Sequence, residues 1–376
     1  MDRVGTVVIG AGQAGLAIGY YLREDFVILD GHERVGDCWR ERYDSLRLFS
    51  RPRYASLPGL RIGTRDCPNR DEMADYLERY AVHHELPVRT GVRVTRLSRD
   101  DDGFLVETTG GDWRADQVVV AAGMHSVPRW PSFAGELDPS IRQLHSLEYR
   151  NPEQFADGTV LVVGAANSGT DIALEAVKTH RTLLAGRHPG QVPIDIDSTA
   201  GHVFTPVVMF LFKYVLTRRT PMGRKAIANA EKAGLPLTRN KLEHLDAAGI
   251  RRIGRIAGVR DGRPVTADGD VLDDVRTVVW STGSDPDHGW IDLPVFGDDG
   301  RPRHVRGVSA DVPGLYFLGL DFQYAIASAS IQGGGPRRSF PRQTSRAADD
   351  SSGDTCGQAV ASPAGMGAWL GVGRSE

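Results

Sequence analysis

Cysteine is scarce in this sequence. Only three of the 376 residues are cysteines, Cys38, Cys67 and Cys356, and they lie far apart, with no Cys-x-x-Cys pair and no Cys/His cluster. Disulfide-stapled folds, zinc modules and dithiol redox centres all need cysteines at close and regular spacing. The sequence therefore excludes a disulfide scaffold and a disulfide reductase with a paired-cysteine centre, and it predicts no metal site.

The chain also lacks a large excess of charge of either sign. Its formal net charge is −3, from 45 Lys and Arg against 48 Asp and Glu. Nucleic acids and acidic membrane surfaces attract strongly basic proteins. The overall balance gives no electrostatic reason to expect a nucleic acid or an acidic membrane surface as a partner.

Long apolar runs are absent as well. The most apolar stretch, residues 203–217, is interrupted by Pro206 and Lys213 and is shorter than the roughly 20 residues that a spanning helix needs. We expect a buried or interfacial helix there, with a loose membrane-facing or substrate-facing surface as the alternative, and no transmembrane span. The N-terminus leads directly into the strand-like VVIG, so we expect no secretory signal and a cytoplasmic location.

Two segments have the pattern of a buried strand, a glycine turn and a helix. They are residues 6–22 and 158–177, and a third apolar run, 275–283, ends at a glycine without a helix behind it. Residues 103–123 add a hairpin and a further apolar strand. Short apolar runs that alternate with helical segments are typical of parallel α/β sheets. We therefore predict an α/β fold with two Rossmann-like dinucleotide-binding domains, which suits the length of the chain.

The first glycine motif, GAGQAG, follows a strand and opens a helix. Gly10 permits the tight turn, Gly12 lets the backbone approach a pyrophosphate, and Gly15 lets the helix pack close to the sheet. The next strand, FVILD, ends at Asp30, whose carboxylate suits two ribose hydroxyls and would repel a 2′-phosphate, which favours FAD or NAD over NADP. The residues predicted to bind this cofactor are Gly10, Gly12, Gln13, Ala14, Gly15 and Asp30.

The second glycine motif, GAANSG, has the same place between a strand and a helix, but Ala166 replaces its middle glycine. The added methyl group is expected to crowd a pyrophosphate. The next strand ends at Arg187 instead of an acid, and a cation there suits the 2′-phosphate of NADPH; the alternative is a surface arginine. We expect the neighbouring His188 to be solvated, with a second phosphate contact as the alternative. The predicted NADPH-binding residues are Gly164, Asn167, Ser168, Gly169 and Arg187.

Six motifs follow one another along residues 1–335: GAGQAG, RVGDCWRERYDSLRL, FAGELDPSIRQLHSLEYR, GAANSG, STG and PGLYFLGL. In this order they resemble the flavin-containing monooxygenases, above all the bacterial single-chain members and the plant indole-3-pyruvate monooxygenases. The resemblance implies an NADPH domain, residues 149–285, inserted into an FAD domain made of residues 1–148 and 286–335.

The same resemblance implies further site residues. The Gly-Asp-x-Trp segment would lie over the FAD, although Trp39 has the alternative of simply packing in a loop. His145 would mark the hinge between domains or be an ordinary linker residue, and Gln323 is a weak catalytic candidate near the flavin. The further FAD contacts implied are Gly36, Cys38, Trp39, Leu46 and Gly319.

The family mechanism would follow. NADPH reduces FAD by hydride transfer to flavin N5, O₂ adds at C4a, and the peroxyflavin delivers one oxygen atom to a small organic substrate. The cofactor carries this chemistry, so the protein mainly positions and shields it. Phe49 stands where the animal branch has an asparagine, which the plant branch also lacks. Two alternatives stay open: a flavin NADPH oxidase or reductase that releases peroxide, and an inactive nucleotide-binding remnant.

The C-terminal segment departs from the family pattern. Family members continue into a helix of the type GRDAA, whereas residues 336–376 are rich in Arg, Ser and Pro without any periodicity. This composition predicts disorder. A frameshift after about Gly335 is our hypothesis for the departure, because a one-base shift can restore a family-like helix.

Overall fold

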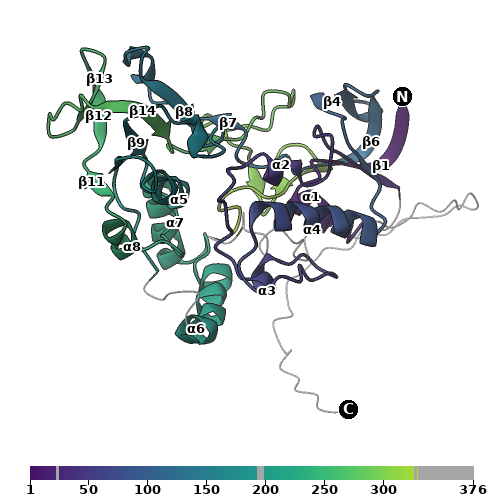
Figure 1. Ribbon diagram of the computed structural model, residues 1–376. Coiled ribbons are helices and arrows are strands. Elements are labelled where there is room, and N and C mark those ends of the chain that lie inside the picture. Colours follow the sequence, from purple (N-terminus) through teal and green to yellow (C-terminus); the bar gives the residue numbers. More distant parts are fainter. Residues whose placement is uncertain (23–24, 193–198, 326–327, 329–376) are drawn as a thin grey trace, which may run out of the picture. The chain divides into compact units, whose positions relative to one another are not determined.

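Two sheets with parallel strands organise the chain (Figure 1). The computed structural model describes residues 1–22, 25–192, 199–325 and 328. The segment 336–376, with its predicted disorder and the frameshift hypothesis, lies outside the described residues.

The first sheet has the order β16-β17-β18-β6-β1-β2-β3, and β5 links β4 to β6. β1 lies between β2 and β6 and runs parallel to both. Its last four residues are all buried, because a central parallel strand is covered on both faces and needs a continuous apolar run. The strands are β1 (Asp2–Ile9), β2 (Phe26–Leu29), β3 (Val88–Arg89), β4 (Val94–Asp100), β5 (Gly103–Thr108), β6 (Trp113–Val120), β16 (His304–Val305), β17 (Val308–Ser309) and β18 (Leu315–Phe317).

The second sheet is parallel throughout, with the order β11-β10-β9-β14-β8. Every residue of β9 is buried, and the apolar run at 275–283 supplies β14, as predicted. Two antiparallel pairs, β12 with β13 and β7 with β15, accompany the sheets. The strands are β7 (Val127–Pro128), β8 (Arg142–His145), β9 (Thr159–Val163), β10 (Thr182–Ala185), β11 (Arg251–Ile253), β12 (Ile256–Arg260), β13 (Arg263–Thr266), β14 (Val275–Trp280) and β15 (Ser284–Asp285).

Helices pack on both sheets. α1 contacts β1, β2 and α4, while α5 contacts β9 and β10. α4 begins at a capping box, in which Asn69 and Glu72 each accept a hydrogen bond of 2.8 Å from the other's backbone N–H. The helices are α1 (Gln13–Gly19), α2 (Asp37–Arg40), α3 (Pro52–Ala55), α4 (Arg70–His83), α5 (Asn167–Ala176), α6 (Thr199–Phe210), α7 (Pro221–Ala233) and α8 (Leu242–Ala247).

The second sheet is inserted in the sequence of the first. Strands β1 to β6 come before it and β16 to β18 after it, and β18 returns to pair with β6. This confirms the predicted α/β class, with one Rossmann-like unit inserted in another. The predicted domain limits after residues 148 and 285 remain predictions; β8, which ends just before the first limit, pairs with β14 of the second sheet.

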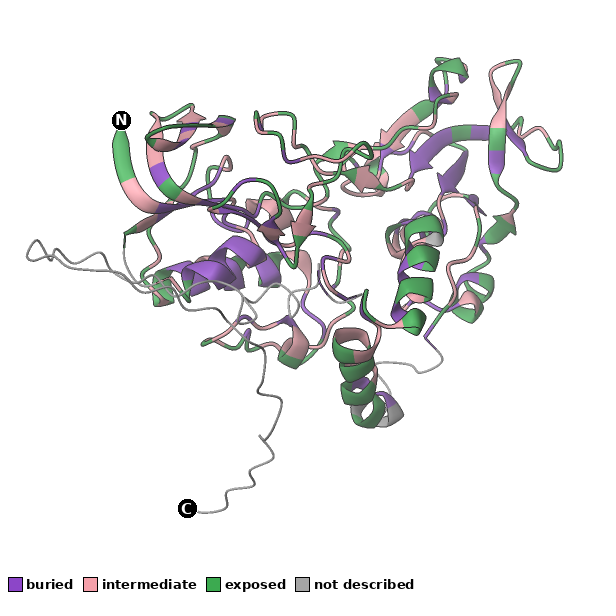
Figure 2. Ribbon diagram, turned by 180° about the vertical axis from the view of Figure 1, so that it is seen from behind, coloured by how far each residue is buried: buried purple, intermediate pink, exposed green. Residues whose placement is uncertain are grey.

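The apolar stretch 203–217 is helical as far as Val215. α6 contains Pro206 and continues into a π-helical turn, Leu211–Val215. Part of this helix is not buried, since α6 is largely in the exposed colour in Figure 2. Among the described residues, no helix combines the length and the apolar character needed to cross a bilayer.

Candidate cofactor site

The first glycine motif forms the turn between β1 and α1. Gly10 has φ +106°, and a Cβ there would lie 2.5 Å from the carbonyl oxygen of Ala121. A Cβ on Gly15 would lie 1.8 Å from the carbonyl oxygen of Gly10, so α1 can pack on the turn only without a side chain. Gly12 differs: its φ is an ordinary −73°, and an added Cβ would meet nothing within 4 Å. The turn thus leaves open space at Gly12, where a pyrophosphate was expected.

The second glycine motif repeats this geometry between β9 and α5. Gly164 has φ +114°, and a Cβ there would lie 2.1 Å from the carbonyl oxygen of Ser281. A Cβ on Gly169 would lie 1.7 Å from the carbonyl oxygen of Gly164. Ala166 has φ −85° and ψ −172°, close to the −73° and −174° of Gly12. The turn therefore accommodates the methyl group of Ala166. The crowding predicted from the sequence could affect only a ligand bound at this turn.

Both turns open on one cavity, which brings most of the predicted residues together. Gly15 and Gly36 do not line it: Gly15 packs under the turn, and Gly36, at φ +93°, lies so close to α4 that a Cβ would be 2.5 Å from the carbonyl oxygen of Ala74. The predicted residues that do line it are Gly10, Gly12, Gln13, Ala14, Asp30, Cys38, Trp39, Leu46, Gly164, Asn167, Ser168, Gly169, Arg187, Gly319 and Gln323.

Asp30 lies buried at the end of β2 with both carboxylate oxygens in use. Oδ2 accepts the backbone N–H of Ala11 at 2.6 Å, which ties the acid to the first glycine turn. Oδ1 accepts the backbone N–H of His32 at 2.8 Å and lies 2.7 Å from its ring Nδ1. Burial by itself raises the pKa of Asp30, but the hydrogen bonds from His32 and Ala11 bring the pKa below its usual value. The acid is therefore held ionised and oriented at the cavity wall.

His32 is a site residue that the sequence did not predict. It lines the cavity two residues after Asp30. The hydrogen bond to Asp30 raises the pKa of His32 against the opposing effect of burial, and Glu41 and Asp37 add to the rise. The sequence signal that could have identified His32 is its position two residues after Asp30, the acid at the end of the strand.

We expect the pair to make stability depend on pH. Because the folded-state pKa of His32 is raised, its contribution is fully present below the ordinary value of 6.5 and is lost as pH rises through the higher folded value. His32→Asn keeps a donor but no charge. The free energy of unfolding lost in this variant should be about 1 kcal/mol larger at acidic than at alkaline pH, measured by denaturant titration. A loss that is constant, or that grows toward alkaline pH, would contradict the pairing.

The segment around Cys38 forms the short helix α2 beside the cavity. Burial raises the pKa of the Cys38 thiol to about 12, which disfavours the thiolate form. Neither Cys38 nor Cys67 forms a disulfide within the described part of the chain. Trp39 lies on the cavity wall, in the place that the resemblance gives to flavin contacts. Phe49 also lines the cavity and is 42% exposed.

The end of β10 carries the predicted NADPH-selective residue. Gly186 has φ +129°, and the exposed Arg187 follows it on the cavity wall. His188, expected to be solvated, is instead half-buried: its Nδ1 accepts the backbone N–H of Gly190 at 3.0 Å, and its Nε2 is buried without a partner in the described part of the chain. Only Arg187 of this pair therefore faces the cavity.

The motif around Leu46 is anchored to α5, the helix that follows the second glycine turn. The hydroxyl of Tyr43 donates to Asp171 of α5 at 2.9 Å, and Ser45 donates to Glu175 of the same helix at 2.6 Å. Asp171 also accepts hydrogen bonds from Arg239 and Asn240. A segment that resembled a flavin contact in sequence thus also holds the helix that opens the second turn.

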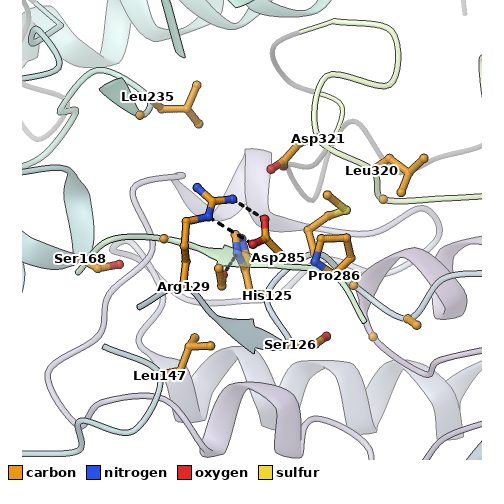
Figure 3. A pocket seen from close by; sticks show the side chains of 18 of the residues that line it. His125, Ser126, Arg129, Leu147, Ser168, Leu235, Asp285, Pro286, Leu320 and Asp321 are labelled. Atoms are coloured by element: carbon orange, nitrogen blue, oxygen red, sulfur yellow. Dashed lines mark hydrogen bonds and ion pairs between the residues drawn. The ribbon is translucent and has the colours of Figure 1, made fainter. Parts of the chain in front are cut away.

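Polar residues of β15 and of the chain on either side of β7 lie close together on the cavity wall (Figure 3). The ring Nδ1 of His125 lies 2.9 Å from Ser284 Oγ, and Arg129 forms an ion pair with Asp285. Burial raises the pKa of Asp321, although His125 and Arg301 oppose the rise. The sequence analysis missed this group, because single residues in loops have no spacing that marks them.

Gln323 and His145 are both fixed by backbone carbonyls. Gln323 is buried and donates from Nε2 to the carbonyl oxygen of Phe317 at 2.8 Å. His145 is buried at the end of β8, and its Nε2 lies 3.0 Å from the carbonyl oxygen of Gly283. Gly319, at φ +78°, lies against Ala14 of the first turn.

Comparisons with known proteins agree with this geometry. A family model described as pyridine nucleotide-disulphide oxidoreductase matches residues 7–195, half of the chain. An uncharacterized CzcO-like oxidoreductase of Geobacillus kaustophilus is 38% identical over 340 residues, 88% of this chain and 95% of that protein. The indole-3-pyruvate monooxygenase YUCCA1 of Oryza sativa subsp. japonica is 34% identical over 180 residues, 46% of this chain and 44% of that protein. A flavin-containing monooxygenase from Stenotrophomonas maltophilia superimposes with a TM-score of 0.72 at 26% identity, covering 89% of this chain and 96% of that chain.

Proposed function

We propose that this chain, which belongs to the pyridine nucleotide-disulphide oxidoreductase family, is an FAD- and NADPH-dependent monooxygenase of a small organic substrate. The predicted resemblance to flavin monooxygenase-like oxidoreductases is confirmed, and with it the enzyme class and, at the level of the family, the cofactors. The disulfide chemistry in the family's description has no support in the described cysteines, because Cys38 and Cys67 form no disulfide with each other and no Cys-x-x-Cys pair is present.

The observation that carries the proposal is the pair of matching glycine turns on one cavity. The first turn, Asp30 and the segment 36–39 would hold FAD, with residues 1–148 and 286–335 as its domain. The second turn and Arg187 would hold NADPH, with residues 149–285 as its domain. Open space at Gly12, the oriented carboxylate of Asp30 and the cation at Arg187 all fit these groups.

When bound, FAD accepts a hydride from NADPH and, once reduced, activates O₂ for transfer of one oxygen atom. The balanced reaction consumes NADPH, a proton, O₂ and the substrate, and yields NADP⁺, water and the oxygenated substrate. The chain itself positions the cofactors through the two turns. Its half-buried and apolar cavity residues, among them Trp39 and Leu46, keep water from the reacting centre.

The visible spectrum of the purified protein tests the cofactor half of this proposal. We expect the absorption of bound oxidised flavin, and we expect anaerobic NADPH to bleach it. Colourless protein that ignores added FAD would contradict the proposal.

Product analysis then tests the oxygenation. With O₂ and a panel of small amines, sulfides and carbonyl compounds, we expect oxygenated product to exceed hydrogen peroxide per NADPH consumed. Peroxide equal to the NADPH consumed with every compound would favour the oxidase alternative.

A further inference from the structure

One side of α6 and of the π-helical turn after it is apolar and exposed. Six large apolar side chains on this segment are between 41% and 67% exposed. Their spacing of three or four residues repeats along one side of a helix. We call this set the α6 face: Val203, Phe204, Val207, Phe210, Leu211 and Tyr214.

The opposite side of the same helix already has its partners. Thr205, Val208, Met209 and Phe212 line a small pocket together with Phe49 and other residues. Met209 and Phe212 also line the cofactor cavity. The inner side therefore faces the described chain, whereas the six side chains of the α6 face are largely exposed. Exposed apolar patches of this kind mark interaction surfaces.

The segment that contains the α6 face, residues 199–230, is positively charged, which favours an anionic partner. Residues 199–230 contain five cationic side chains and no Asp or Glu, although the whole chain has a net charge of −3. Lys213 belongs to the π-helical turn itself, where its Nζ lies 5.7 Å from the ring centroid of Tyr214. Arg224 and Lys225 are exposed on α7. The cations are Lys213, Arg218, Arg219, Arg224 and Lys225. Arg218 and Arg219 also line the cofactor cavity, so Lys213, Arg224 and Lys225 are the cations left for a partner.

We propose that the α6 face docks on the surface of a bilayer containing anionic phospholipids. A helix with an apolar face and flanking cations lies in the plane of the interface, its apolar side chains among the acyl chains and its cations at the headgroups. A second copy of this chain fits less well, because a two-fold contact would bring two cationic segments together. Docking would place one wall of the cofactor cavity at the membrane, whatever reaction the cavity performs.

Vesicle co-sedimentation of the full-length, FAD-supplemented protein tests the proposal. We expect binding to vesicles of equal parts phosphatidylglycerol and phosphatidylcholine, weakening with added salt, and far less binding to pure phosphatidylcholine. Phe210→Ser should lower the partition coefficient about tenfold, since it removes a large apolar group from the interface. The double variant Arg224→Gln/Lys225→Gln should lower binding only to the anionic vesicles.

Val82→Ser is the matched control, because Val82 is an exposed helical valine on α4, 74% exposed and outside the α6 face. It should bind vesicles as the wild type does. Circular dichroism and thermal melting show that each variant is folded.

Failure to bind the anionic vesicles, or unchanged binding by folded Phe210→Ser, would overturn the proposal. So would a wild-type dimer that Phe210→Ser converts to monomer, which would assign the face to a second copy. A monomer that binds neither vesicle would point to coverage by residues 329–376 and would equally overturn it.

Discussion

Gly15→Ala is expected to yield a chain that is unstable and purifies without flavin. The new Cβ would lie 1.8 Å from the carbonyl oxygen of Gly10, and that atom belongs to the backbone of a turn that already has φ +106°. Neither the new Cβ of residue 15 nor the carbonyl group of Gly10 can move without separating α1 from the sheet. Overpacking of this kind costs about 3 kcal/mol or more. Thermal melting and the flavin content of the purified protein measure the effect.

Gly12→Ala is the matched control in the same turn. Its Cβ would meet nothing within 4 Å, and its backbone conformation is one that Ala166 adopts at the matching position of the second turn. We expect its apoprotein to melt like the wild-type apoprotein but to bind FAD more weakly, because the methyl group would occupy ligand space. A yellow Gly15→Ala protein with wild-type melting would contradict the described packing of α1. Unchanged FAD affinity in Gly12→Ala would contradict a pyrophosphate at this turn.

The second large effect is expected from Arg187→Ala. This exposed guanidinium lies on the cavity wall after β10, where the 2′-phosphate of NADPH would be bound. Loss of a charge-assisted contact should raise the KM for NADPH by about tenfold to a hundredfold while changing the KM for NADH by less than about twofold. Stopped-flow reduction of the flavin by each nucleotide measures both.

Arg251→Ala controls for the loss of a cation in the same region. Arg251 is exposed on β11, the strand next to β10, and does not line the cavity. This variant should keep the wild-type preference for NADPH. If Arg187→Ala raised the KM for NADPH and the KM for NADH equally, the arginine would act on the fold. If Arg251→Ala raised the KM for NADPH as much as Arg187→Ala does, the effect would be a general one of surface charge.

The elements that local sequence determines could be predicted. The glycine turns were recognisable because Gly10, Gly15, Gly164 and Gly169 occupy positions where a Cβ meets backbone atoms within 3 Å, which leaves little choice of residue. The buried strands were recognisable because parallel strands covered on both faces need unbroken apolar runs. Local steric demands of this kind leave a pattern in a single sequence.

Contacts between distant segments left no such pattern. Tyr43 and Asp171 are 128 residues apart in the chain, and His125 and Ser284 are 159 apart. The polar group around His125 and Ser284 depends on such pairs and was missed for that reason. His188 was misjudged because its burial depends on the chain around Gly190, not on its own neighbours in a strand.

The return of the chain from the second sheet to the first sets an order of assembly during synthesis. β18 pairs with β6 through Leu315–Val118 and its neighbours, so nearly 200 residues separate the two strands. Residues up to Trp280 complete the five-stranded sheet, whereas β16 to β18 leave the ribosome only afterwards. Domains generally fold as units as they emerge, and long-range pairings close last. The nascent chain would thus hold a finished nucleotide unit while β6 still exposes an unpaired edge, which makes roughly the last quarter of synthesis the period most open to aggregation.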